Sequence, residues 1–120
     1  CVVVRRDNFE KLFVSLDGIE ARITEELANV TTSLYEKAAA NRAARTYTAT
    51  TMEELVAIAA EKNGYIRAMW CGELDCELKL KEEADVSSRC IPFGDTEEVS
   101  DVCVCCGKPA KKLVYWGKAY

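Results

Sequence analysis

The sequence predicts an α+β fold in which a β-hairpin and a long helix lead into a small mixed sheet with flanking helices and a four-cysteine zinc site. Three observations predict this fold. Short β-branched runs alternate with segments of helical periodicity, four of the seven cysteines stand in two close pairs, and no apolar run reaches the roughly 20 residues that span a bilayer. With 120 residues, 49% of them hydrophobic, the chain can bury an ordinary core, and we expect no membrane partner.

The first third of the chain is predicted to be a hairpin followed by a helix. Residues 2–16 have β-branched residues on either side of the turn residues Asp7 and Asn8. Asp17 is a candidate N-cap for a helix that continues to about residue 45. Apolar residues recur along this helix at gaps of three and four, which predicts one face packed as core under the zinc-bearing sheet. They are Leu16, Ile19, Ile23, Leu27, Val30 and Leu34.

The remaining chain is predicted to alternate between strands and helices. Thr51 and Glu54 have the spacing of a capping box for a helix over residues 52–62, and Asn63 and Gly64 follow as a stop signal. The other expected elements are an extended segment at 47–49, strands at 65–70, 88–93 and 112–116, and a helix at 75–84. The predicted organisation has three parts, residues 1–16, a connecting long helix at 17–46, and a zinc-binding domain at 47–120.

The paired cysteines have the spacing of a zinc site. Cys71 and Cys76 form a first hook, and Cys103 and Cys106 form a second that Gly107 follows directly. Four thiolates suit the tetrahedral geometry of Zn²⁺. Cys105 competes with its neighbour as a ligand, but the turn at the glycine favours position 106 and leaves Cys105 as a spare thiol.

Composition excludes several kinds of chemistry. The chain has no histidine, which excludes two-cysteine, two-histidine zinc sites and Ser-His and Cys-His nucleophile pairs. A closed four-sulfur site has no open position for substrate, which makes the expected metal structural, and we assign no catalytic or cofactor-binding residues. A net charge of −4 is poorly suited to binding a phosphate backbone.

Two other interpretations of the cysteines remain open. They could be core thiols or disulfides, although seven cysteines would leave one unpaired. Redox catalysis by Cys103 and Cys106 is disfavoured, because a strand rather than a helix is expected after them. Cys90 lies in an apolar strand and is expected to be a small buried side chain.

Several blocks, taken together and in order, closely resemble the C-terminal region of prolyl-tRNA synthetase of the archaeal and eukaryotic-like type. The resemblance covers essentially the whole chain and includes its last residue, Tyr120. The blocks are residues 2–7, Trp70-Cys71-Gly72 with Cys76, residues 88–93, residues 106–111 and residues 117–120.

The resemblance implies a role for each part. Residues 1–16 would be the end of an anticodon-binding domain, and the zinc ligands would be Cys71, Cys76, Cys103 and Cys106. The carboxylate of Tyr120 would lie towards a catalytic domain that this sequence lacks.

The same resemblance implies that the parent protein is a class II aminoacyl-tRNA synthetase, a proline–tRNA ligase. It would be a cytoplasmic homodimer that activates proline with ATP and Mg²⁺ and transfers it to tRNA(Pro). The segment itself would be a structural, non-catalytic appendage. A stand-alone zinc module that mediates protein or RNA contacts and a thiol redox protein are the alternatives.

Overall fold

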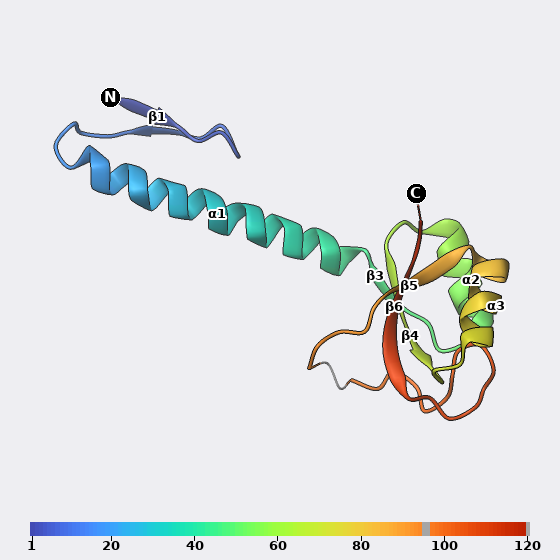
Figure 1. Ribbon diagram of the computed structural model, residues 1–120. Helices are drawn as coiled ribbons and strands as arrows, with labels where there is room; N and C mark the ends of the chain where they lie inside the picture. The colour runs from blue at the N-terminus through green and yellow to red at the C-terminus, as the bar shows by residue number, and fades with distance from the viewer. Residues whose placement is uncertain (95–96, 120) are drawn as a thin grey trace. The chain divides into compact units, whose positions relative to one another are not determined.

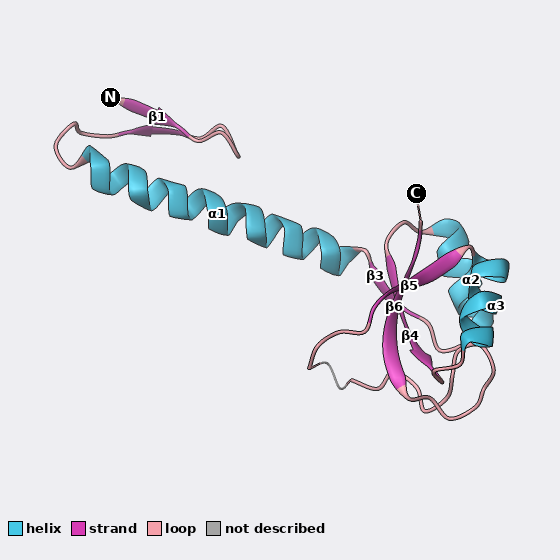
Figure 2. Cartoon of the chain, viewed as in Figure 1, coloured by secondary structure: helices cyan, strands magenta, loops and turns pink. Residues whose placement is uncertain are grey.

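The chain divides into two units, Cys1–Ala43 and Ala44–Tyr120 (Figure 1). The computed structural model describes residues 1–94 and 97–119. The predicted α+β fold class is confirmed, because a hairpin and a long helix precede a mixed sheet with two helices (Figure 2). No helix of the described residues is both long enough and apolar enough to cross a membrane.

The first unit consists of the predicted hairpin and most of the long helix. Strands β1 (Val2–Val4) and β2 (Lys11–Phe13) pair antiparallel, and helix α1 runs over Ile19–Ala44. The N-cap prediction is wrong, because Gly18 with φ +75° lies between Asp17 and the first helical residue.

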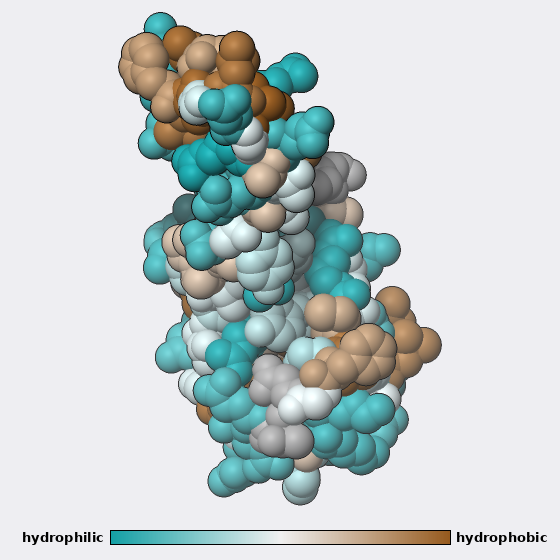
Figure 3. All heavy atoms as spheres, turned by 90° about the vertical axis from the view of Figure 1, so that its left-hand side faces the viewer, coloured by the Kyte–Doolittle hydropathy of each residue, from teal (hydrophilic) through white to brown (hydrophobic). Residues whose placement is uncertain are grey.

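The apolar face predicted on α1 is not core. Ile23 is 41% exposed, Leu27 64% and Leu34 53%, and the buried residue of this helix is Glu26. The hairpin also presents exposed apolar side chains, among them Phe13 at 85%, and Figure 3 shows apolar atoms gathered at the hairpin end of this unit. The 3.6-residue period therefore identified an apolar stripe but not its burial.

Ion pairs join the hairpin to the helix in place of an apolar core. The Arg5 guanidinium lies 2.7 Å from the Asp7 carboxylate and 3.8 Å from that of Glu26. Arg22 lies 2.6 Å from Glu26 on the same helix. Because these side chains neutralise one another, Glu26 can be covered without remaining an unpaired charge.

The second unit is built on a four-stranded sheet in the order β3-β4-β6-β5. Strand β3 pairs parallel with β4, and the other pairs are antiparallel. The strands are β3 (Thr46–Thr48), β4 (Tyr65–Trp70), β5 (Val86–Cys90) and β6 (Lys112–Lys118). Strand β5 begins and ends earlier than the range predicted for it, and β6 continues beyond its predicted end.

Two helices lie on the same side of this sheet (Figure 2), namely α2 (Met52–Glu61) and α3 (Leu74–Ala84). The predicted capping box is present, because the Thr51 hydroxyl accepts from the Glu54 N–H and the Glu54 carboxylate accepts from the Thr51 N–H. Lys62 is the C-cap of α2, just before the predicted stop signal.

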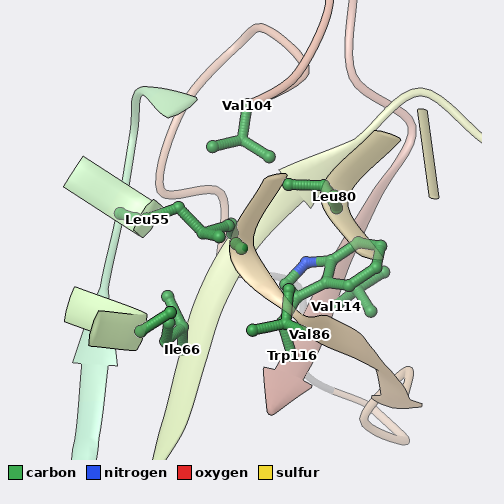
Figure 4. Close-up of a cluster of buried hydrophobic side chains, with 11 residues drawn as sticks. Leu55, Ile66, Leu80, Val86, Val104, Val114 and Trp116 are labelled. Carbon is green, nitrogen blue, oxygen red and sulfur yellow. The ribbon is translucent and has the colours of Figure 1, made fainter. Parts of the chain in front are cut away.

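The hydrophobic core lies between the sheet and these helices (Figure 4). Leu55 and Leu80 of the helices and Trp116 of the sheet have no exposed surface. Every buried apolar side chain among the described residues belongs to this second unit. The predicted burial of Cys90 is wrong. This thiol is exposed, and the pairing of β5 with β6 is shifted by a bulge just before it.

Candidate metal centre

The first cysteine hook joins a strand to a helix. Cys71 follows the last residue of β4, and Cys76 lies in the first turn of α3. Between them the chain reverses at Gly72, whose φ of +93° is strained for residues with a side chain. The Trp70 indole N–H donates to the Glu73 carbonyl over 3.2 Å, which ties the strand end to the hook.

The second hook is a tight loop fastened to the same strand end. The Cys103 N–H donates to the Lys108 carbonyl, and the Gly107 N–H donates to the Cys103 carbonyl, at 2.8 and 3.0 Å. The Val104 N–H donates to the Met69 carbonyl and the Lys111 N–H to the Trp70 carbonyl. These two bonds to β4 bring the hooks together, although more than 25 residues separate them in sequence.

Four sulfur atoms converge where the hooks meet. The Sγ atoms of Cys71, Cys76, Cys103 and Cys106 all lie within 4.8 Å of one another. Cys71 Sγ is 3.6 Å from Cys76 Sγ and 3.8 Å from Cys106 Sγ. In a tetrahedral zinc site with Zn–S bonds of about 2.3 Å, the sulfur atoms are about 3.8 Å apart. The two sulfur–sulfur distances given above therefore fit tetrahedral Zn²⁺.

The surroundings of the sulfurs differ from one to the next. Burial raises the pKa of the Cys71 and Cys76 thiols. Burial also acts to raise the pKa of Cys103, but hydrogen bonds from the backbone N–H groups of Cys106 and Cys105 outweigh it and lower this pKa to about 7. Backbone donors that face sulfur stabilise the thiolate form, which is the form that binds metal.

A soft cation fits this donor set. Three of the thiols are buried side by side, where their negative forms would repel one another unless a cation lay between them. Thiolates favour zinc over the harder Mg²⁺ and Ca²⁺, and four of them leave no open position for a substrate. The arrangement can therefore stabilise a fold, but it does not present a metal-bound water for catalysis.

The other candidate residues lie in different places. Cys105 is half-buried and packs against the cluster of Cys71, Cys76 and Cys103 without belonging to the four-sulfur group. Cys1 and Cys90 are exposed thiols. Tyr120 lies outside the described residues.

Sequence reasoning missed the residues that align the two hooks. Val104 is buried, and its backbone N–H anchors the second hook to β4. In the sequence, the only sign of this anchoring role was that Val104 is an apolar residue between two cysteines. The backbone N–H of Glu73, which faces Cys71, has no sequence signal, because any residue can supply that donor.

Fold and site together define a small α+β domain in which four cysteine sulfurs converge. The family model described as "Prolyl-tRNA synthetase, C-terminal" matches residues 52–120, which include both hooks. The chain belongs to this prolyl-tRNA synthetase C-terminal family.

Known relatives match the chain over its whole length. It is 56% identical over 120 residues to a proline–tRNA ligase of Agathobacter rectalis and 57% identical over 119 residues to a proline–tRNA ligase 2 of Bacillus cereus. These matches cover 100% and 99% of this chain but 25% of each relative. The chain thus spans about a quarter of the length of the curated relatives it matches.

A solved structure supports the fold. The crystal structure of prolyl-tRNA synthetase from Cryptosporidium parvum, complexed with L-proline and AMP, matches with a TM-score of 0.89 at 27% identity. The match covers 99% of this chain and 25% of the Cryptosporidium chain.

Proposed function

We propose that this chain is the C-terminal part of a proline–tRNA ligase and that its second unit is a non-catalytic domain held together by one Zn²⁺. The observation that carries the proposal is the convergence of four sulfur atoms within 4.8 Å inside the segment that matches the family. Cys71, Cys76, Cys103 and Cys106 are the proposed ligands. The parent enzyme would be a cytoplasmic homodimer that activates proline with ATP and Mg²⁺ and attaches it to tRNA(Pro).

A structural role for the metal follows from where the ligands lie. They join the end of β4, the start of α3 and the loop before β6, so one ion would link three segments of the second unit. Such a site forms only when the chain is folded, which makes metal binding part of the folding free energy. Removal of the metal is therefore expected to unfold this unit first.

Elemental analysis and native mass spectrometry test the metal. We expect one Zn²⁺ per chain, lost in Cys76→Ser together with a clear fall in the melting temperature. Cys90→Ser is the matched control, because that thiol is exposed and outside the cluster, and it should keep both metal and melting temperature. A well-folded wild-type chain without metal would refute the zinc proposal.

The activity proposal is tested by proline-dependent ATP–pyrophosphate exchange. The full-length parent should catalyse the exchange and the 120-residue chain should not, because the proposal assigns ATP and proline to the part of the enzyme outside it. Exchange by the purified chain above a blank would contradict the non-catalytic role.

A finer part of the proposal concerns the terminal residue. Strand β6 ends two residues before Tyr120 and is held by pairing to both β4 and β5. We propose that the terminal carboxylate braces the catalytic domain of the parent. Deletion of Tyr120 in the full-length enzyme should then lower kcat/KM for proline more than it lowers the melting temperature, and an unchanged kcat/KM would rule this role out.

A further inference from the structure

The four corners of the proposed metal centre are not equally protected. Cys71, Cys76 and Cys103 are 3%, 7% and 2% exposed, whereas Cys106 is exposed. Cys106 also lies in a loop rather than in a helix or strand. Three ligands therefore form a buried base, and the fourth is the one that alkylating agents or oxidants reach.

A fifth thiol lies beside that exposed corner. Cys105 directly precedes Cys106 in the same tight loop, and its side chain packs against the three buried cysteines. This thiol therefore already lies against the proposed buried ligands.

We propose that Cys105 is a reserve metal ligand that takes the fourth corner when the Cys106 sulfur is lost or blocked. The inference rests on the proposed zinc site and adds a residue to it. When Cys106 is alkylated, its sulfur becomes a neutral thioether and no longer supplies a thiolate. The Cys105 thiol would then release its proton to solvent and supply the fourth thiolate, so the charge of the centre would be unchanged.

The fold favours this exchange for two reasons. The buried base belongs to ordered segments, since Cys71 and Cys76 frame the junction of β4 and α3, and Cys103 is fixed by its hydrogen bond to Lys108. Only a short piece of loop has to move, because the two competing thiols are neighbours in sequence. A centre with three fixed ligands and two interchangeable ones should keep its metal after modification of the exposed thiol.

Cobalt substitution tests the proposal directly, because Co²⁺ accepts the same tetrahedral thiolate site and its charge-transfer absorption grows with the number of bound thiolates. The chains to compare are wild type, Cys105→Ser, Cys106→Ser, the double variant and the control Cys90→Ser. We expect the single variants to keep the wild-type intensity per bound Co²⁺. The double variant should lose about a quarter of it, since one thiolate of four is missing.

Two results would overturn the inference, and they have different meanings. If Cys106→Ser has the reduced intensity of the double variant, Cys105 does not replace Cys106, while the zinc proposal survives. If the wild-type chain binds neither Co²⁺ nor Zn²⁺, both proposals fail.

A second measurement does not depend on the double variant folding. Wild-type and Cys105→Ser chains loaded with Zn²⁺ are treated with iodoacetamide until mass spectrometry shows the label on Cys106. We expect the labelled wild type to release Zn²⁺ to a chelator more slowly than labelled Cys105→Ser, which has three thiolates left. Equal release from both chains would overturn the reserve role.

Discussion

The two units of this chain contain helices with similar apolar periodicity, and they use it in opposite ways. On α3 one face, formed by Cys76, Leu80 and Ala84, is core, and Leu80 has no exposed surface. On α1 the stripe is open, and Leu27 is 64% exposed. The comparison shows that periodicity predicts which residues share a face of a helix, whereas burial depends on which other elements are available to cover that face.

The second unit has enough layers to cover its helices. A four-stranded sheet provides one wall, α2 and α3 pack on it, and the cysteine hooks tie the loops at one end. The first unit has a single helix and a two-stranded hairpin, and a hairpin of that size is marginal on its own in water. Its fully buried side chain is therefore the charged Glu26, paired with Arg5 and Arg22, and its apolar side chains are at most half-buried.

The largest expected difference between the two units is in the free energy of unfolding lost by a matched pair of leucine substitutions. Leu80→Ala should cost roughly 2–5 kcal/mol, because it leaves a cavity against buried neighbours. Leu27→Ala should change the free energy of unfolding by less than about 0.5 kcal/mol, as at other exposed positions. Urea denaturation of the two variants and the wild type measures both values.

The contrast between the leucines can fail in two ways. A cost above about 2 kcal/mol for Leu27→Ala would show that the face of α1 is covered in solution, for example by another copy of the chain. A cost below about 0.5 kcal/mol for Leu80→Ala would mean that the core of the second unit is not the one described.

The sequence predicted the convergence of four cysteines better than it predicted the packing of α1. Cysteine spacing carries the geometry of the site almost by itself, because a tetrahedral centre needs two short hooks and a glycine to turn the chain. Gly107 favoured Cys106 over Cys105, and the Cys106 sulfur is the one that lies in the four-sulfur group. The position of this loop against β4, held by the Val104 N–H bond, had no signal in the sequence.

Long-range and cooperative features account for the other misses. Cys90 was expected to be buried from its apolar neighbours, but a bulge next to it changes how the strand pairs with β6. The start of α1 was assigned to Asp17, although a glycine with positive φ occupies the position before the helix. Local capping signals were more dependable at Thr51 and Glu54, where both partners are three residues apart.

An intermediate effect is expected from two threonines that hydrogen-bond to backbone in different ways. Thr51 caps α2 of the second unit, so Thr51→Ala should cost about 1 kcal/mol by leaving an N–H group without its acceptor. Thr24 lies inside α1, where its hydroxyl donates to the Glu20 carbonyl. Thr24→Ala should be neutral or slightly stabilising, because alanine is the better helix former.

Thermal unfolding followed by circular dichroism compares the two threonine variants. Equal losses of stability would contradict the assignment of Thr51 as a specific cap. A loss at Thr24 alone would show that α1 depends on its side-chain bonds more than α2 does, which would reverse the proposed difference between the units.

The smallest expected effect is the loss of stability of the first unit in acid. A hydrogen bond from the Arg5 guanidinium is the main cause that holds the pKa of Asp7 below its ordinary value, with smaller contributions from its own backbone N–H, the Arg5 charge and Ser33. The two side chains are 11% and 4% exposed, but the hairpin and one helix form a thin layer, so water lies close and weakens the pair. Glu54 in the capping box also has a lowered pKa, caused first by the Thr50 N–H, so acid affects both units.

The sign of the pH effect follows from the lowered pKa of Asp7. Because the folded state holds this carboxylate in its charged form, the contribution to stability is present above the ordinary aspartate pKa of about 3.9 and is lost as the pH falls through the lower pKa of the folded state. Nuclear magnetic resonance signals of the hairpin, followed from about pH 7 to about pH 2, should shift towards unfolded values in that window. In Asp7→Asn the hairpin should be looser at neutral pH and should respond less to acid, while strand β4 behaves as in the wild type. An identical acid response in both chains would show that the Arg5–Asp7 pair does not hold the hairpin to α1, and that the first unit depends on other contacts.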